Sequence, residues 1–203
     1  MLIDLSVPLN ETTPRYPGDP ETKIIPAGTL EEEGYQGHYV SVGTHVGTHM
    51  DAPSHMLKGG KNLDQFPIEQ FSGHGLYIDC TKGFALATFE RAEVTPGAIV
   101  LFHTGIDASY GDPGYFRDYP SIPEEIARYL VGKKIKIIGV DMCSPDHPPF
   151  AIHKILLGAG ILIIENLTNL AALKDKRFHV FAFPIKLGID AAPVRVVADV
   201  ITT

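Results

Sequence analysis

The sequence is poor in the features that mark secreted, membrane-spanning and metal–thiolate proteins. It has only two cysteines, Cys80 and Cys143, and neither stands in a Cys-x-x-Cys pair. We therefore expect two buried free thiols in a reducing cytosol, since disulfide frameworks and thiolate metal sites need more cysteines. The longest apolar run, residues 158–164, falls far short of the roughly 20 residues that a membrane-spanning helix requires.

Basic residues are also scarce. The chain has 17 lysines and arginines against 24 aspartates and glutamates, which gives a formal net charge of -7. No basic cluster exceeds two residues, so we expect neither nucleic acid nor an anionic membrane as a partner. Residues 1–8 include Asp4, lack a basic start and alternate like a strand. No signal peptide is therefore expected, and the cytoplasm is the expected location.

Hydrophobic residues, by contrast, make up 44% of the 203 residues, enough for a full core in one domain spanning 1–203. Apolar runs and alternating patterns predict strands at 2–8, 22–26, 38–45, 76–80, 98–103, 135–141, 161–165, 178–184 and 194–201. A helical turn is predicted at 63–71 and helices at 88–92, 121–131 and 149–157. Ser121 is expected to cap its helix, and the proline pair 148–149 to lie in a first turn. Together they predict an α/β domain with a mixed sheet, antiparallel in the strand-rich first half.

The densest group of chemically active side chains lies in residues 41–56, which read SVGTHVGTHMDAPSHM. This stretch contains His45, His49, Asp51 and His55, separated by glycines and a proline that turn the backbone. Imidazole nitrogens and carboxylate oxygens suit borderline divalent metals such as zinc, manganese and iron. Because packing alone has no use for so many desolvated polar groups, the stretch predicts a metal site.

The positions of these groups along the chain predict different roles. We expect His45 to close a strand, and His49 and Asp51 to follow within a tight loop. Their even spacings would place all three on one face of a regular strand. Three protein ligands with an open position are typical of a catalytic metal. His55, with an ordinary pKa of about 6.5, is either a fourth ligand or a general acid/base.

A second set of polar residues follows much later in the chain. Asp141 and Glu165 end two apolar strands, and His153 lies on the predicted helix between them. Sites in α/β sheets assemble at the carboxyl ends of neighbouring strands. A bridging Asp51 could then hold two metals about 3.5–4 Å apart, which activate water and polarise a carbonyl. Alternatively, Glu165 pairs with a buried lysine or arginine, and His153 merely faces the sheet. Asp141 is interpreted as structural or as a group that orients a ligand.

One aromatic residue, Tyr16, stands in a polar loop, residues 10–20, that three prolines keep out of a strand. It is either a packing anchor or a lid residue over a pocket, since loops often carry function. Residues 105–119 form a second long loop with several glycines, aspartates and tyrosines, and the pattern assigns it no role.

These residues together resemble the cyclase family of metal-dependent hydrolases, which includes bacterial kynurenine formamidase and isatin hydrolase. The family hallmark HxGTHxDxPxH is present without departure at residues 45–55, as HVGTHMDAPSH. The motif is too specific to be expected by chance. Further segments also resemble the family, namely Asp4-Leu-Ser6, Tyr16-Pro-Gly-Asp19, Ile138-Gly-Val-Asp141 with Ser144, residues 153–166, Pro184, Asp190 and Pro193-Val-Arg195.

The resemblance implies a swivelling β/α/β fold and a site for two divalent metal ions. The metal is zinc in the formamidase and manganese in isatin hydrolase, so either is a candidate here. The implied metal ligands are His45, His49, Asp51, His153 and Glu165. Asp51 would bridge the two ions, and His55 would be the catalytic acid/base. Members of the family form dimers or tetramers, so a homodimer or homotetramer is expected.

The resemblance also implies an activity, the hydrolysis of a carbon–nitrogen bond in an aryl formamide or cyclic amide. N-formylkynurenine is the first substrate to consider. The formamidase has a tryptophan where this chain has Tyr16 as the expected substrate contact, and the tyrosine hydroxyl and smaller ring change the pocket. A lactonase or ring-closing cyclase would have the same site, and a silent metal- or small-molecule-binding protein is a further alternative. His55 argues against the last, because a metal store needs no acid/base group there.

Overall fold

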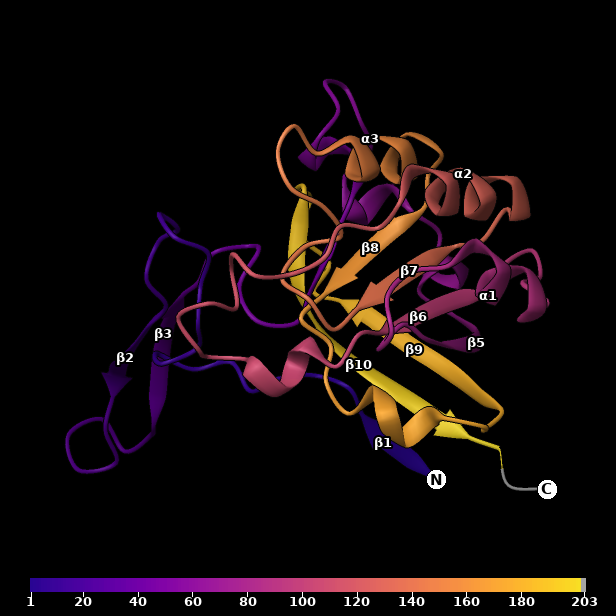
Figure 1. Cartoon of the computed structure of the whole chain (residues 1–203). Coiled ribbons are helices and arrows are strands. Elements are labelled where there is room, and N and C mark those ends of the chain that lie inside the picture. The colour runs from indigo at the N-terminus through magenta and orange to yellow at the C-terminus, as the bar shows by residue number, and fades with distance from the viewer. Residues whose placement is uncertain (202–203) are drawn as a thin grey trace.

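A closed ring of strands forms the frame of the molecule in the computed structural model, which describes residues 1–201 (Figure 1). The strands are β1 (Leu2–Asp4), β4 (His49–Asp51), β5 (Ser72–Asp79), β6 (Ile99–His103), β7 (Ile137–Val140), β8 (Leu162–Glu165), β9 (Phe178–Pro184) and β10 (Ala191–Val200). They follow the order β1-β10-β4-β8-β7-β6-β5-β9, and β9 also pairs with β10, which closes all of these strands except β1 into a ring. Strand β1 pairs with β10 alone. Strands β5 to β8 are parallel and the other pairings antiparallel, so the predicted α/β fold with a mixed sheet is confirmed.

Three helices connect the parallel strands and lie on one side of the sheet (Figure 1). They are α1 (Leu86–Arg91), α2 (Glu124–Lys133) and α3 (Ala151–Gly158). Parallel neighbours require such crossovers, because the chain must return to the same end before the next strand begins. The capping prediction is wrong: Pro123 precedes α2 and no side chain caps it. The proline pair 148–149 also lies before α3 rather than in its first turn. Short 3-10 turns occupy Pro53–His55, Leu63–Gln65, Ile68–Phe71, Ile106–Ser109 and Leu170–Leu173.

Side chains of the ring alternate between two hydrophobic cores. One core contains Met50, Leu101 and Ile164 and is formed mainly by the strands themselves. The other contains Val100 and Ile163 and includes the apolar residues of the helices. Burial on both faces explains why β6 and β8 are continuous apolar runs in the sequence. Because Met50 belongs to the first core, its two neighbours in β4 point to the opposite face, toward the helices.

Strand β4 is the element that the sequence pattern misplaces. The pattern predicts a loop over 47–62 and a strand closed by His45, but β3 (Gly37–Ser41) ends before that histidine. His49–Asp51 form the fully buried β4 inside the predicted loop. β4 has only three residues, and a flanking glycine and proline give the stretch the composition of a loop. Pairing with β8 and β10, which lie far away in the sequence, makes it a strand.

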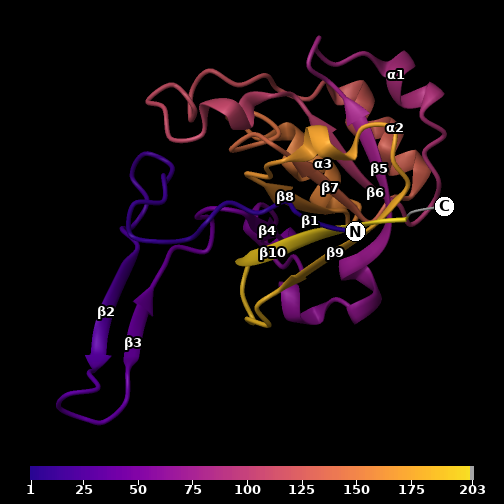
Figure 2. The same ribbon diagram turned by 90° about the horizontal axis from the view of Figure 1, so that it is seen from below.

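Two further strands form a sheet of their own. Strands β2 (Lys23–Gly28) and β3 pair with each other in a separate antiparallel sheet. Figures 1 and 2, which differ by a quarter turn, both show this ribbon projecting away from the ring. We refer to residues 21–41 as the arm.

The two cysteines are free and buried, as the sequence predicts. Burial raises the pKa of Cys80 and of Cys143 to about 12, so both thiols stay protonated near neutral pH. Within residues 1–201, none of the helices has the length and apolar character needed to cross a membrane.

Candidate metal centre

The pairing of β4 with β8 places three of the predicted ligands on one face of the sheet. His49 and Asp51 are two residues apart in β4, so their side chains point to the same side. Glu165, the last residue of β8, is the direct cross-strand partner of His49. Helix α3 packs over this part of the sheet and brings in His153. The 3-10 turn Pro53–His55 follows β4 almost directly, which places His55 beside the same group.

Asp51 lies at the centre of the group. Its Oδ1 is 2.9 Å from Nδ1 of His45 and 3.5 Å from Nε2 of His49. Its Oδ2 faces the other way and is 3.8 Å from Nε2 of His153. Glu165 spans the same gap, with Oε2 at 3.2 Å from Nε2 of His49 and Oε1 at 3.3 Å from Nε2 of His153. The structure thus brings all five predicted ligands together, and the two Asp51 oxygens divide as a bridging carboxylate requires.

Several of these atoms have no hydrogen-bond partner among the described residues. Nε2 of His49 and both carboxylate oxygens of Asp51 are buried and unsatisfied, although His45 and His49 lie close by. Orphaned polar atoms of this kind are costly and rare in folded proteins. Nδ1 of His49 lies 2.9 Å from the carbonyl oxygen of Gly47, which leaves Nε2 as the free nitrogen. The residues therefore fit a divalent metal with nitrogen and oxygen ligands.

The electrostatics of the group favour positive charge. Burial lowers the pKa of His45, but the neighbouring Asp51 carboxylate outweighs it, and the pKa rises to about 9. Burial likewise lowers the pKa of His153, yet Asp146 and Glu165 raise it to about 10. Burial would raise the pKa of Asp51, but the surrounding histidines hold it below its usual range. Buried carboxylates that stabilise imidazolium so strongly would equally stabilise a bound cation.

His55 stands at the edge of the group. Its ring centroid is 4.1 Å from that of His45, and its Nδ1 is 3.5 Å from Oδ2 of Asp190. The same Asp190 oxygen lies 3.0 Å from Nε2 of His45. His55 also offers an atom within 4.8 Å of atoms from Asp51 and His153. This position is compatible with both predicted roles, a further ligand and a proton carrier.

A cavity of about 220 Å³ opens onto the group. Its lining consists of Tyr16, Asp19, His45, His55, Met56, Cys143, Ser144, Phe150, His153 and Glu165. The Tyr16 ring packs edge-on against Phe116 of the loop 105–119, with centroids 5.9 Å apart. The two sequence-based interpretations of Tyr16 therefore do not exclude each other, because the side chain is anchored by packing and also lines the cavity. The loop 105–119 contributes to the site by holding Tyr16 in place.

Two carboxylates near the group are absent from the predicted site. Oδ1 of Asp146 is 2.5 Å from Nδ1 of His153, and its Oδ2 accepts a hydrogen bond from the backbone of Ile152. Asp190 contacts His45 and His55, as described above. The only available signal for Asp146 is that it stands seven residues before His153, in the segment DHPPFAIH. Asp141 lies apart, where its carboxylate accepts hydrogen bonds from Thr104 and Gly105 and fastens a loop.

An Asp146→Asn substitution is expected to weaken metal binding by roughly 10- to 100-fold, because the carboxylate orients the ring of His153 and increases its basicity. Asparagine can still accept the hydrogen bond from the backbone of Ile152, so the fold should be kept, but the metal-free protein should unfold at a lower temperature because the buried ion pair with His153 is lost. Competition with a fluorescent chelator would measure the affinity, and the exposed Asp112→Asn serves as the matched control. Equal affinity in the Asp146→Asn protein and the control would contradict this role.

The protein is therefore an α/β protein with a closed mixed sheet. Beneath one of its helices lies a buried cluster of imidazoles and carboxylates, the side chains that commonly bind divalent metals. Residues 3–147 match the family model described as "Putative cyclase". The chain therefore belongs to this cyclase family, as the HxGTHxDxPxH motif predicts.

Individual proteins are similar to this chain over nearly their whole length. An uncharacterized protein of Methanocaldococcus jannaschii is 36% identical, with 90% of this chain and 91% of that protein covered. Kynurenine formamidase of Bacillus cytotoxicus is 31% identical, with 96% and 95% covered. Among solved structures, isatin hydrolase A from Labrenzia aggregata has a TM-score of 0.85 at 25% identity, covering 98% of this chain and 93% of that one. A structure described as a potential metal-dependent hydrolase with cyclase activity has a TM-score of 0.80 at 29% identity, with 98% and 96% covered.

Proposed function

We propose that the protein is a metal-dependent hydrolase that cleaves the carbon–nitrogen bond of an aryl formamide or a cyclic amide. The observation that carries the proposal is the set of buried, unpartnered ligand atoms on His49 and Asp51 beside a cavity with aromatic walls. The names of two relatives, kynurenine formamidase and isatin hydrolase, support amide hydrolysis as the reaction class. The description of a third as a potential metal-dependent hydrolase supports the use of a metal.

The proposed ligands divide into two half-sites that share Asp51. His45, His49 and Asp51 would hold one divalent ion, and Asp51 would extend to a second held by His153 and Glu165. Zinc and manganese both suit this mixture of imidazole and carboxylate ligands. When bound, such ions lower the pKa of water and polarise a carbonyl oxygen.

The remaining residues of the cavity would orient the substrate and move protons. His55 lies on the cavity wall, where an imidazole can take a proton from water and deliver it to the leaving nitrogen. The same carboxylate oxygen of Asp190, Oδ2, contacts both His55 and His45. Its role is therefore to position both rings.

The walls of the cavity favour an aromatic substrate. Tyr16, Phe150 and Met56 supply flat or adaptable apolar surface next to the polar group. Because Tyr16 already rests against Phe116, it can stack on a ligand ring with little loss of rotamer freedom. N-formylkynurenine, an aromatic formamide, is therefore the first substrate to test.

The test uses the full chain loaded with zinc or with manganese. We expect it to hydrolyse N-formylkynurenine, another aryl formamide or a cyclic amide such as isatin, to lose the activity in a chelator and to regain it when metal returns. Aryl lactones belong in the same screen, because a lactonase would have the same metal ligands. Failure to turn over any amide, together with an activity on lactones alone, would replace the proposed reaction by the alternative one. Tight metal binding without turnover of any of these compounds would favour the alternative of a catalytically silent binding protein.

A further inference from the structure

The residue that follows Glu165, Asn166, is a buried asparagine in an unusual backbone conformation. It is 5% exposed, and its φ of 56° lies in the left-handed region, which asparagine tolerates better than most residues. Its backbone N–H donates to the carbonyl oxygen of Met142 at 2.9 Å. Its carbonyl oxygen accepts a hydrogen bond of 2.7 Å from Oγ1 of Thr48. The backbone of Asn166 is thus fixed on both sides of the α carbon, which restricts where its side chain can lie.

The side-chain amide of Asn166 has a buried partner at each end. Nδ2 donates to the carbonyl oxygen of Gly47 at 2.9 Å, and Oδ1 accepts a hydrogen bond of 2.8 Å from the hydroxyl of Tyr115. A backbone carbonyl can only accept, so the amide nitrogen must face Gly47 and the amide oxygen must face Tyr115. The Tyr115 hydroxyl therefore determines which way round the amide is held.

The carbonyl oxygen of Gly47 also accepts a hydrogen bond of 2.9 Å from Nδ1 of His49. A carbonyl oxygen has two lone pairs, so it can accept from the imidazole and from the amide of Asn166 together. With its proton on Nδ1, His49 directs the lone pair of Nε2 toward Asp51 and Glu165. The direction of the Gly47 carbonyl therefore sets the direction of this ring.

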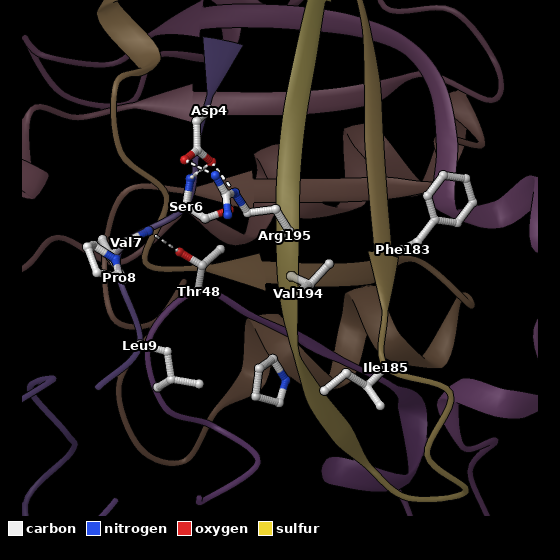
Figure 3. A pocket seen from close by; sticks show the side chains of 11 residues that line it. Asp4, Ser6, Val7, Pro8, Leu9, Thr48, Phe183, Ile185, Val194 and Arg195 are labelled. Carbon is white, nitrogen blue, oxygen red and sulfur yellow. Dashed lines mark hydrogen bonds and ion pairs between the residues drawn. The ribbon is translucent and has the colours of Figure 1, made fainter. Parts of the chain in front are cut away.

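Gly47 needs such support because a glycine backbone is freer than any other. Its φ is 65°, again in the left-handed region. The next residue, Thr48, is held by its hydroxyl, which accepts a hydrogen bond of 2.9 Å from the backbone of Val7 (Figure 3) and donates to Asn166. These bonds fasten the chain beside Gly47 but do not reach its carbonyl oxygen. The amide of Asn166 supplies that contact.

Tyr115 belongs to the loop 105–119. It is 2% exposed, and burial raises the pKa of its hydroxyl far above the ordinary value, so the group remains a donor. Its ring packs edge-on against Tyr110 and Phe116, with centroids 5.1 Å apart in both pairs. Phe116 is also the residue against which Tyr16 packs. The loop thus contacts both the cavity wall and the hydrogen bonds that lead to His49.

We propose that Asn166 and Tyr115 are positioning residues of the metal centre. Tyr115 orients the amide of Asn166, and the amide orients the carbonyl that holds the imidazole of His49. The inference rests on the proposed function, in which His49 is a metal ligand. Neither positioning residue lines the cavity. Their loss should therefore weaken metal binding and lower kcat, while KM stays unchanged.

The first test is the zinc affinity of the full chain with Asn166→Gly. Glycine keeps the left-handed backbone and removes only the amide. We expect zinc to bind roughly 10-fold or more weakly in competition with a fluorescent chelator. The matched control is Asn169→Gly, at a second asparagine with a φ of 59°, whose amide donates to the carbonyl oxygen of Asp4 on the exposed surface at 2.9 Å. The control should bind zinc as the unaltered protein does.

A second variant, Tyr115→Phe, keeps the buried ring and removes the hydroxyl. Its control is Tyr129→Phe, which removes a hydroxyl that donates to the carbonyl oxygen of Phe89, away from the metal centre. Tyr115→Phe should also weaken zinc binding, and its control should not. Because the hydroxyl is proposed to act through the amide, adding Tyr115→Phe to Asn166→Gly should cause no further loss of zinc affinity. Additive losses of affinity would contradict this order of action.

Nitrogen NMR of the imidazoles in the zinc-loaded protein separates positioning from a general effect on stability. The Nδ1–H of His49 should exchange slowly with solvent in the unaltered protein and roughly tenfold faster in Asn166→Gly, because the carbonyl has lost one of its two donors. Asn169→Gly should leave this exchange unchanged. Equal zinc affinity in Asn166→Gly and Asn169→Gly would overturn this inference alone. An unaltered protein that binds neither zinc nor manganese would overturn the proposed metal centre as well.

Discussion

Replacing Asp51 by asparagine is expected to strip the protein of bound metal and to lower the rate of amide hydrolysis by roughly a thousandfold or more. The carboxylate is almost completely buried and accepts no hydrogen bond among the described residues. Its two oxygens face different histidines, His45 and His49 on one side and His153 on the other. Asparagine has nearly the same shape but no charge, and its amide nitrogen would face one half-site. One half-site would therefore lose a ligand, and the other would keep only a neutral and weaker amide oxygen in place of a carboxylate.

Metal content after dialysis, measured by plasma mass spectrometry, checks this prediction alongside kcat/KM. Asp112→Asn is the matched control, because it removes an exposed carboxylate on the loop 105–119 and leaves the donor group untouched. Circular dichroism would show that both variants keep their fold. If the Asp51→Asn protein retained the metal content of the unaltered protein, Asp51 would not be a ligand. The proposal that two half-sites share Asp51 would then be wrong.

Replacing His55 by alanine is expected to reduce turnover by roughly 10²- to 10⁴-fold while leaving the metal content unchanged. The side chain lies on the cavity wall. Its Nδ1 is 3.5 Å from Oδ2 of Asp190, which is not one of the proposed metal ligands. A group that protonates the leaving nitrogen contributes to the rate, and its loss takes no ligand away. The defect should be smaller for an activated aryl ester, whose leaving oxygen needs no proton.

Two measurements separate the two roles of His55. Metal content distinguishes a ligand from a proton carrier, and the ratio of rates on amide and ester reports proton delivery to the leaving group. His74→Ala, at an exposed position of β5, is the control for loss of an imidazole elsewhere. Loss of metal in the His55→Ala protein would make His55 a ligand. Equal losses of rate on the amide and on the ester would contradict the proposal that His55 protonates the leaving nitrogen.

Many of the strands could be predicted from the sequence because their signal is local. The runs at 98–103, 161–165 and 178–184 are apolar over a strand's length, and the structure has β6, β8 and β9 at these places. The helices were predicted within a few residues, except that Ser121 does not cap α2. Such signals depend on burial of consecutive side chains, and a sequence shows that directly.

Other parts of the fold depend on pairings between distant segments, which no local pattern contains. β4 is a strand only because β8 and β10 flank it, and its three residues alone have the appearance of a loop. Ring closure by the pairing of β9 with β10 is of the same kind. Asp146 and Asp190 were absent from the predicted site because an isolated aspartate in a loop has no pattern that shows which histidine it will face.

The sequence by itself determined which ligand types this protein offers, through the motif at residues 45–55 and the polar residues that end or follow apolar strands. It determined this because residue chemistry and spacing are written in the chain. Only the tertiary structure decided that the two sets form one group: the register of β4 against β8 sets His49 opposite Glu165, and α3 brings His153 to the same side. It also decided that the arm stands free of its own ring. These outcomes depend on the register in which distant strands pair, and the packing of the whole core determines that register.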